Sequence, residues 1–369
     1  MITFLNFAPI EFMGGAERWM YETAKYVNKK EKTIVLSVGQ SLANIYSQVV
    51  LGRNFEKRVI LPNANLISLK ISSFIPFTKN YKEINKIMNE SRLIYIKFEI
   101  AELIILIYYG GFNILKKVIA GFHSPFYYQT PVSNIEKLHN YIYISRPIKN
   151  ILSRVNKIHV LNIRDLEFLQ HEFGLKKVIN IPTSIRVKTS QKILTNNHKF
   201  KILFVGELSK RKGVDILLDI IKNAPKNDFQ FDIVGNGAME NDVILASTCY
   251  NNCKYHGFLN SRKLSELYRS FDALILPSRA EGFPLVFHEA MANGLVILDS
   301  VNTQMGFPNY TEYTSSNNAP NEYISIIKKL KGNNKKNKVA KEKNRIIKYY
   351  KSHFEDSIIK KQLSKAIFA

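Results

Sequence analysis

Residues 279–294 combine two carboxylates with a glycine–proline turn. Glu281 lies on the turn, and Glu289 follows eight residues later in a stretch with helical spacing. Carboxylates repel phosphates but accept hydrogen bonds from neutral hydroxyls, as acidic side chains do on ribose or sugar rings. The pair therefore favours a site for a hydroxylated ligand. A structural reading stays open, in which Glu281 caps the helix and Glu289 is a solvated helix position.

The elements on either side of the turn predict how these carboxylates are positioned. The apolar run 271–277 has the length and β-branched content of a buried parallel strand. Pro284 suits the first turn of a helix, where a missing N–H costs nothing, and Gly294 is a typical C-terminal stop. The order is thus strand, tight loop and helix. The start of such a helix offers free N–H groups and a partial positive charge to an anion.

This stretch resembles the signature of the family 4 retaining nucleotide-sugar glycosyltransferases, which have the GT-B fold. The resemblance rests on sixteen consecutive positions, with the two glutamates embedded in Glu-Gly-Phe-Pro and Glu-Ala-Met-Ala. It implies that Glu281 meets the transferred sugar and that Glu289 holds the nucleotide ribose. It also implies donor contacts at the turn and the helix start, through Gly282, Phe283, Pro284 and Leu285.

A second stretch carries the positive charge that a diphosphate requires. Residues 202–206 read as a strand that ends in Gly206, and Lys212 precedes the glycine that opens the next helix. The resemblance implies that Lys212 contacts the donor diphosphate. The family's arginine position is occupied by Glu207, and the neighbouring Arg211 is the candidate replacement. Fixed cations aimed at a leaving group lower the barrier to its departure. The alternative is a solvated basic turn.

The remaining candidates follow other predicted strands. Gly14 and Gly15 permit a close backbone approach at a helix start, and the family has a matching element that contacts donor phosphate and acceptor. His123 follows the predicted strand 117–122, and the resemblance implies that it faces the sugar, orienting it more than acting as an essential base. A histidine bonded to a loop carbonyl is the alternative. The extended segment 255–258 adds Gly257 and Phe258 as donor-binding candidates.

Strands and helices alternate twice along the chain. This pattern predicts an α/β protein with two Rossmann-like, doubly wound parallel sheets, and the resemblance implies an interdomain cleft between them. We expect an N-terminal, acceptor-side domain over residues 1–190 and a nucleotide-sugar-binding domain over 200–350. The polar residues 189–199 read as a linker, and the last helix, about 352–369, is expected to rejoin the first domain.

The composition limits which cofactors and which cellular setting are expected for this protein. The chain has 369 residues and a formal net charge of +23. The two cysteines, Cys249 and Cys253, lack metal-ligand spacing, and no Asp-x-Asp triplet occurs, so no metal or other cofactor is expected. The cysteine usage favours a reducing, cytoplasmic setting. The uncharged start, residues 1–6, is expected to be a strand and not a signal peptide.

A basic run, residues 328–351, holds eleven Lys or Arg and one acidic residue. It is either a solvated helix face or a surface for an anionic membrane, which would place the protein peripherally at the inner membrane face. Nucleic acid is the less favoured partner, because the run has few interleaved aromatics.

These features predict a retaining, metal-independent hexosyltransferase. Its donor would be a nucleotide diphosphate sugar and its acceptor a glycan or a lipid-linked glycan. Two rivals keep the same fold. One is a nucleotide-sugar epimerase, and the other is a nucleotide-sugar-binding protein with weakened catalysis, for which Glu207 is the main argument.

Overall fold

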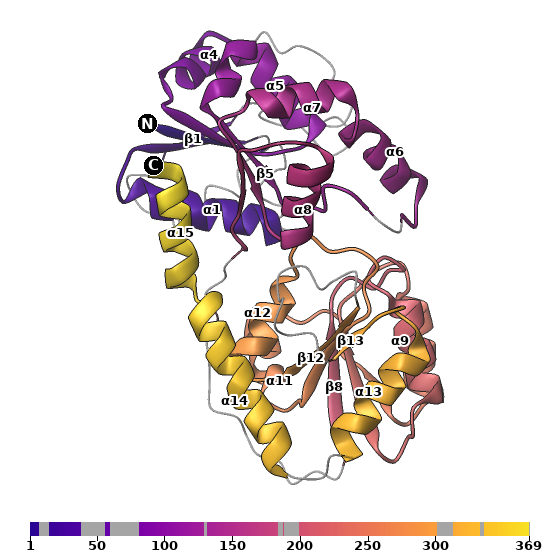
Figure 1. The fold of residues 1–369 in the computed structure, drawn as a ribbon. Helices are drawn as coiled ribbons and strands as arrows, with labels where there is room; N and C mark the ends of the chain where they lie inside the picture. The colour runs from indigo at the N-terminus through magenta and orange to yellow at the C-terminus, as the bar shows by residue number, and fades with distance from the viewer. Residues whose placement is uncertain are drawn as a thin grey trace. The chain divides into compact units, whose positions relative to one another are not determined.

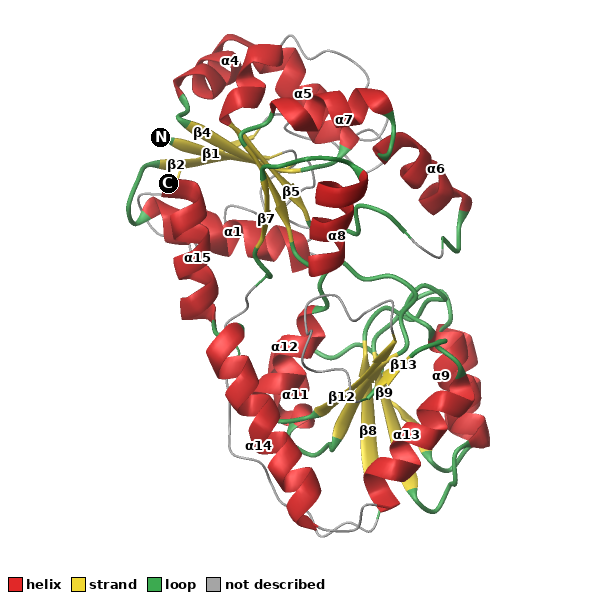
Figure 2. Cartoon of the chain, viewed as in Figure 1, coloured by secondary structure: helices red, strands yellow, loops and turns green. Residues whose placement is uncertain are grey.

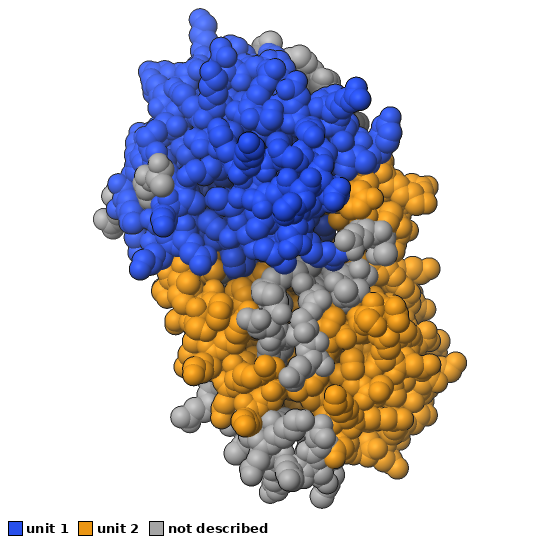
Figure 3. All heavy atoms as spheres, in the orientation of Figure 1, with its two compact units in different colours: residues 1–126, 141–183, 360–369 blue, residues 127–140, 184–359 orange. Residues whose placement is uncertain are grey.

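The computed structural model describes residues 1–6, 15–37, 56–59, 81–128, 131–183, 187, 199–300, 313–332 and 336–368. The chain divides into two compact units (Figure 3). Unit 1 comprises residues 1–126, 141–183 and 360–369, and unit 2 comprises residues 127–140 and 184–359. Each unit is built around its own parallel sheet, with helices on both faces (Figures 1 and 2).

The first sheet has seven strands in the order β3-β2-β1-β4-β5-β6-β7, and every neighbouring pair is parallel. The strand numbers rise on both sides of β1, so the direction of the strand order reverses between β1 and β4. Buried apolar residues dominate β1, β2, β4, β5 and β6, as expected for strands covered on both faces. The strands are β1 (Ile2–Asn6), β2 (Thr33–Ser37), β3 (Glu56–Val59), β4 (Leu93–Lys97), β5 (Val118–Phe122), β6 (Lys157–Val160) and β7 (Val178–Asn180).

The helices that precede residue 184 follow the strands in alternation. A short π-helix extends α8, where the sequence predicts one continuous helix from Asp165 to His171. The helices are α1 (Gly15–Asn28), α4 (Tyr81–Glu90), α5 (Ile100–Gly110), the 3₁₀-helix η2 (Phe112–Lys117), α6 (Asn134–Tyr143), α7 (Arg146–Arg154), α8 (Ile163–Glu167) and the π-helix η3 (Phe168–Glu172).

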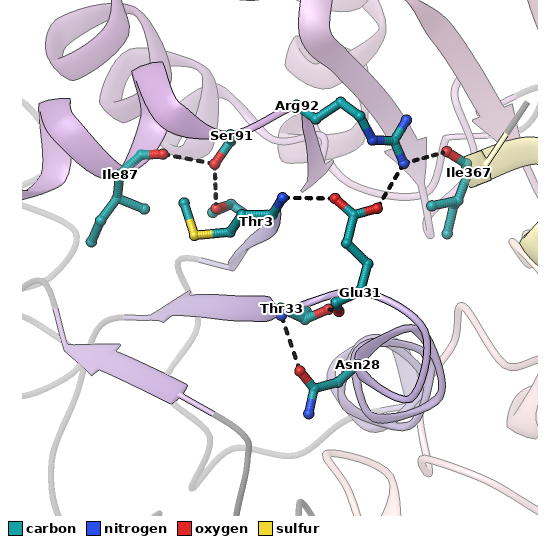
Figure 4. Close-up of polar contacts among 9 residues, drawn as sticks. Thr3, Asn28, Glu31, Thr33, Ile87, Ser91, Arg92 and Ile367 are labelled. Carbon is teal, nitrogen blue, oxygen red and sulfur yellow. Dashed lines mark hydrogen bonds and ion pairs between the residues drawn. The ribbon is translucent and has the colours of Figure 1, made fainter.

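The C-terminal helix α15 (Asp356–Phe368) is bound to unit 1 at its end. Lys30 donates to the hydroxyl of Ser364 at 2.8 Å, and Lys157 donates to the carbonyl of Ala366 at 2.7 Å. Figure 4 shows a third contact, in which Arg92 reaches the carbonyl of Ile367 while it also pairs with Glu31 at 3.0 Å. Glu31 accepts from the chain's N-terminal ammonium as well, so both ends of the chain meet the same carboxylate network.

The second sheet has six strands in the order β10-β9-β8-β11-β12-β13, again with parallel pairings. Its order reverses between β8 and β11. Strand β12 begins two residues after Gly294, and the sequence analysis did not identify it. The strands are β8 (Phe200–Val205), β9 (Phe229–Val234), β10 (Cys253–Tyr255), β11 (Ala273–Leu276), β12 (Val296–Ser300) and β13 (Thr314–Ser315).

The helices of unit 2 complete a doubly wound architecture, which confirms the predicted α/β fold class. The motif over 271–294 forms strand β11, a loop and helix α12 as predicted. Pro284 is the residue before the helix and not part of its first turn. The predicted strand 59–62 is shifted to β3, and residues 60–62 lie outside the described residues. The helices are α9 (Val214–Asn223), α10 (Glu240–Cys249), α11 (Ser261–Tyr268), α12 (Leu285–Ala292), α13 (Pro320–Gly332) and α14 (Lys336–His353).

Candidate functional site

Two loops leave the second sheet at the point where its strand order reverses. The loop 206–213 follows β8, and the loop 277–284 follows the neighbouring strand β11. In doubly wound sheets, ligands bind at this position, because the chain departs to opposite faces on its two sides. These two segments are called the switch-point loops below.

An ion pair joins the switch-point loops. The ammonium of Lys212 lies 2.6 Å from Oε1 of Glu281. Glu281 is 5% exposed, and the Lys212 side chain is also largely covered. The structure thus brings together two residues that the sequence analysis assigned to one site, although they are 69 positions apart.

Arg279 holds the same two loops in register. Its guanidinium makes a bidentate contact with the carboxylate of Asp215, with both N···O distances 2.8 Å. Its backbone N–H donates to the carbonyl of Arg211 at 2.8 Å. The planar fork of arginine matches a carboxylate at two points, so this contact fixes orientation as well as distance. The contact raises the pKa of Arg279 and lowers the pKa of Asp215 against the opposing effect of burial.

Glycine is required where the loops approach most closely. Gly213 has φ of +71° and precedes α9. A Cβ atom at this position would lie 1.9 Å from the carbonyl oxygen of Pro277. Gly206 follows β8, and its backbone N–H donates to the carbonyl of Val234 at 3.1 Å. The glycine that follows Lys212 therefore sets the distance between the switch-point loops.

Arg211 is the candidate replacement for the family's arginine, whose position Glu207 occupies. In the structure, Arg211 pairs with Glu207 itself. Its guanidinium lies 3.1 Å from the carboxylate of Glu207. It also donates to the carbonyl of Ala280 at 3.4 Å. Arg211 thus lies at the switch-point loops, with its charge balanced by Glu207.

The start of α12 lies beside these groups. Pro284 precedes the helix and makes no side-chain cap. Phe283 is 8% exposed and packs against Phe354 with ring centroids 5.8 Å apart. Gly282 precedes it and is buried on the turn. A helix start without a side-chain cap has the geometry to receive an anion.

Glu289 lies one turn into α12 and accepts a hydrogen bond from the hydroxyl of Tyr268 at 2.9 Å. Tyr268 is 1% exposed, and burial together with this carboxylate raises its pKa well above the ordinary tyrosine value. Tyr268 therefore stays a hydrogen-bond donor and orients Glu289.

Gly257 and Phe258 follow strand β10. The carbonyl of Gly257 accepts from the N–H of Gly235 at 3.0 Å, and the ring of Phe258 is 74% exposed. The segment is thus tied to the loop after β9, while its aromatic side chain projects into solvent.

Unit 1 holds the other predicted residues. Gly15 is the first residue of α1, and Gly14 lies outside the described residues. His123 follows β5, and its Nε2 atom is 3.0 Å from the hydroxyl of Tyr95 on β4. The hydroxyl of Tyr95 also lies 2.7 Å from Nδ1 of His159 on β6, whose Nε2 atom is 2.6 Å from the carbonyl of Ile181. These three side chains form the histidine–tyrosine chain.

The partners of this chain fix the direction of every hydrogen bond in it. A carbonyl only accepts, so Nε2 of His159 donates to Ile181. Burial lowers the pKa of His159 to about 4, so the ring is neutral near pH 7 and its Nδ1 accepts from Tyr95. Tyr95 then accepts from Nε2 of His123. Burial also holds the pKa of His123 well below its usual value, and nearby His159 and Lys97 add to this effect.

These hydrogen bonds leave His123 with one acceptor atom, Nδ1. Because neutral His123 carries its proton on Nε2, its Nδ1 presents a lone pair. This atom is buried and has no hydrogen-bond partner among the described residues. The ring of Trp19 lies 4.6 Å from that of His123, and Gly121 leaves the space that the Tyr95 hydroxyl occupies. The alternative reading, a histidine bonded to a loop carbonyl, fits His159 and not His123.

The sequence analysis missed four residues that hold these groups in place, namely Arg279, Tyr268, Tyr95 and His159. The apolar run around His159, which forms β6 (Lys157–Val160), was a signal for a strand but not for a site residue. Arg279 and Asp215 carry opposite charges but lie 64 positions apart in the sequence. Only the pairing of β8 with β11 shows that they meet.

Within the described ranges, no group of three or more His, Cys, Asp or Glu side chains could hold a metal ion. In the same part of the chain, none of the helices combines the length and apolar character needed to cross a membrane.

Residues 186–350 match the family model described as "Glycosyl transferases group 1". An uncharacterized 41.2 kDa protein in the cps region of Klebsiella pneumoniae is 32% identical over 113 residues, which is 31% of each chain. The amylovoran biosynthesis glycosyltransferase AmsD of Erwinia amylovora is 30% identical over 140 residues, or 36% of this chain and 40% of AmsD. These alignments therefore span less than half of each relative.

The similarity of fold extends over the whole chain. The Anabaena protein Alr3699/HepE, solved in complex with UDP-glucose, superposes with a TM-score of 0.73 over 99% of this chain and 98% of that one, at 16% identity. The predicted fold, two parallel-sheet α/β domains of the GT-B type, is thereby confirmed.

Proposed function

We propose that this chain, whose residues 186–350 match the family model of the group 1 glycosyl transferases, transfers a hexose from a nucleotide diphosphate sugar to a glycan or lipid-linked acceptor. The observation that carries the proposal is the Lys212–Glu281 ion pair across the switch-point loops. It places a cation and a carboxylate together at the position where this fold class binds nucleotides.

Each member of the Lys212–Glu281 ion pair gains a new partner when a donor binds. The diphosphate replaces Glu281 as the partner of Lys212, and Glu281 turns to the hydroxyls of the sugar. The start of α12 and Arg211 add positive potential near the phosphates, while Glu289, oriented by Tyr268, accepts from the ribose. The departing diphosphate gains charge as the glycosidic bond breaks, so these preplaced groups stabilise the transition state more than the ground state.

His123 contributes an acceptor in this proposal. Its Nδ1 lone pair is directed by the histidine–tyrosine chain and receives a hydroxyl of the bound sugar. The ring is neutral and Nε2–H is committed to Tyr95, so His123 orients the sugar. It is not positioned to shuttle a proton through both nitrogens.

The finer assignments are part of the proposal. The resemblance of residues 279–294 to the family 4 signature supports family 4, and the resemblance implies retention of the anomeric configuration, with same-face attack on an ion-pair-like transition state. Lys212, Arg211 and the start of α12 supply the charge that a metal ion provides in other transferases, which supports metal independence. Two free thiols, Cys249 and Cys253, support a reducing cytoplasmic setting.

A panel of nucleotide sugars tests the donor assignment. UDP-, GDP- and ADP-linked hexoses are added to the full chain in excess, and thermal unfolding is followed. A donor at about 100 times its Kd stabilises the folded state by roughly 2.7 kcal/mol, so one member should raise the Tm clearly above the rest. Donor hydrolysis and transfer are then measured with that member, with and without EDTA. No stabilisation by any member would contradict the proposal.

One observation favours a second candidate, a nucleotide-sugar-binding protein with weakened catalysis. Both cations of the switch-point loops are balanced by carboxylates, Lys212 by Glu281 and Arg211 by Glu207. If the panel finds a stabilising donor that is neither hydrolysed nor transferred, this candidate is the correct one.

A further inference from the structure

The turn that follows β13 contacts the second of the switch-point loops. Strand β13 lies at the edge of the second sheet beside β12, and residues 316–319 connect it to α13 (Figure 1). In this turn, the side chain of Asn318 donates from Nδ2 to the carbonyl of Pro277 at 3.0 Å, across 41 positions of sequence. Pro277 is the first residue of the loop 277–284 and lies four positions before Glu281. A third loop therefore bears on the candidate site.

Asn318 adopts a backbone conformation that few residue types accept. Its φ is +52°, and no other non-glycine residue of the described chain has a positive φ. Glycine, asparagine and aspartate tolerate this left-handed region best. Of these three, only asparagine also carries a side-chain N–H donor. The residue type thus meets two requirements at once, the shape of the turn and a donor toward Pro277.

Both ends of the Asn318 amide are used, which fixes its orientation. A carbonyl only accepts, so Nδ2 must face Pro277. Oδ1 then accepts from the hydroxyl of Tyr323 on α13 at 2.9 Å. Tyr323 is fully buried, and burial raises its pKa well above the ordinary tyrosine value, so its hydroxyl remains a donor.

Glu322, in the first turn of α13, holds the turn itself. Its carboxylate accepts from the hydroxyls of Ser315 at 2.6 Å and Ser316 at 2.9 Å, and from the backbone N–H of Asn317 at 3.2 Å. These hydrogen bonds, that of Ser315 foremost, lower the pKa of Glu322 to about 2, so the carboxylate is ionised at neutral pH. Asn318 therefore projects from a turn that is bonded at three consecutive residues.

Each residue between the end of β11 and Glu281 is held by a hydrogen bond from a neighbouring element. Pro277 is held from the turn after β13, and the carbonyl of Ser278 accepts from the hydroxyl of Ser300, at the end of β12, at 2.6 Å. The backbone of the next two residues bonds to Arg211 in the loop after β8. The segment leads to Glu281, whose carboxylate forms the ion pair between the switch-point loops. The position of this carboxylate thus depends on the hydrogen bonds at residues 277–280.

We propose that Asn318 is a positioning residue for the transfer reaction. By holding the carbonyl of Pro277, it fixes the start of the loop that presents Glu281 to the hydroxyls of the bound sugar. Small displacements of a group that orients a substrate lower the rate far more than they weaken binding. This inference rests on the proposed function and extends it to a residue outside both switch-point loops.

Hydrogen–deuterium exchange of the ligand-free full chain tests whether Asn318 holds the loop. Asn318→Gly accepts the positive φ and removes the amide, and Asn318→Asp keeps the acceptor and removes the donor. In both variants, the amides of residues 278–283 should exchange roughly 2- to 10-fold faster than in wild type, because the loop loses one hydrogen bond. Asn321→Asp adds the same charge at an exposed position of α13 and should leave this exchange unchanged.

Initial rates of transfer test whether Asn318 acts through Glu281. Asn318→Gly should lower kcat roughly 3- to 10-fold, while binding of the bare nucleoside diphosphate, measured by isothermal titration, stays within about twofold of wild type. In the Glu281→Gln background, the same substitution should lower kcat no further, because the carboxylate that it positions is already gone. A purely structural role would lower kcat by the same factor in both backgrounds.

Two results would overturn the inference. One is unchanged exchange of residues 278–283 in both Asn318 variants, and the other is an equal fall in kcat in both backgrounds. Circular dichroism should show all variants folded. If wild type turns over no nucleotide sugar, the proposed function fails, and the exchange measurement then decides by itself whether Asn318 holds this loop.

Discussion

The two units place their candidate residues in opposite physical environments. In unit 2, charged side chains of the switch-point loops and of the first turn of α9 form ion pairs where β8 and β11 end, with Lys212 on Glu281 and Arg279 on Asp215. In unit 1, neutral rings of His123, Tyr95 and His159 form a buried, directed chain of hydrogen bonds. The first arrangement can exchange partners when a charged ligand arrives. The second cannot change without giving up a buried hydrogen bond.

This difference assigns different tasks to the two regions. Ion pairs between loops respond to the charge of a diphosphate, so unit 2 is suited to bind and release it. A chain of neutral rings with fixed tautomers offers a hydroxyl one acceptor in one direction, so unit 1 is suited to orient a sugar. Four experiments separate these tasks.

The largest effect is expected in unit 2, from Lys212→Ala. It should reduce donor turnover roughly 100- to 1000-fold, because the departing diphosphate loses a fixed cation. Initial rates of donor hydrolysis or transfer measure this, with circular dichroism to confirm folding. Lys210→Ala removes an exposed lysine from the same loop and should keep most of the wild-type rate. Near wild-type turnover in Lys212→Ala would remove this lysine from the mechanism.

Acidification should destabilise the protein through the buried histidines of unit 1. The folded-state pKa of His159 is about 4, below the ordinary value of 6.5, so the unfolded state binds more protons between these values. Its contribution to stability is therefore complete above pH 6.5 and is lost as the pH falls toward 4. Between pH 7 and pH 5 this amounts to roughly 2 kcal/mol for one such histidine. Urea unfolding at both pH values measures it.

A non-titrating variant isolates this contribution. His159→Gln should show a smaller loss of stability between pH 7 and pH 5 than wild type. His171→Gln, at an exposed position of the same unit, should keep the wild-type loss. Equal losses in wild type and His159→Gln would show that His159 does not carry the effect.

A smaller effect is expected from Tyr95→Phe, which keeps the ring and removes the hydroxyl of the histidine–tyrosine chain. His123 is then no longer held with its proton on Nε2. Losing one such hydrogen bond costs about 0.5–1.5 kcal/mol, so kcat should fall roughly 3- to 10-fold while binding of the free nucleotide is unchanged. A change in nucleotide binding with kcat intact would reverse the tasks assigned to the two units.

The smallest effect is expected from Glu207→Gln, which frees Arg211. Exposed pairs contribute about 0.2–1 kcal/mol, so nucleoside diphosphate binding should tighten by roughly two- to fivefold at low salt. Isothermal titration measures this, and the gain should shrink as salt is added. Weaker binding would mean that Glu207 itself supports the site.

The loops of unit 2 were largely predictable from the sequence, because their chemistry is local. Glu281, Pro284 and Glu289 lie within nine consecutive positions, so their spacing reports the turn and the helix directly. The link from Lys212 to Glu281 came from the family resemblance, and the structure supplies the contact. Pro284 was misplaced by one position, since helix boundaries are set by backbone angles that the sequence does not define to one residue.

The chain in unit 1 was only partly predictable. His123 was identified, but Tyr95 and His159 read as ordinary strand residues. Their meeting depends on β4, β5 and β6 lying side by side, and on Gly121 leaving space for the tyrosine hydroxyl.

The central claim is that Lys212 passes from Glu281 to the diphosphate when the donor binds. The effect of Glu281→Gln on two quantities tests this most directly. Binding of the bare nucleoside diphosphate, measured by isothermal titration, should tighten, because the lysine loses its competing carboxylate. Sugar transfer in the same variant should fall by at least tenfold, because the carboxylate that accepts from the sugar is gone. Weaker nucleoside diphosphate binding, or transfer at the wild-type rate, would contradict the account.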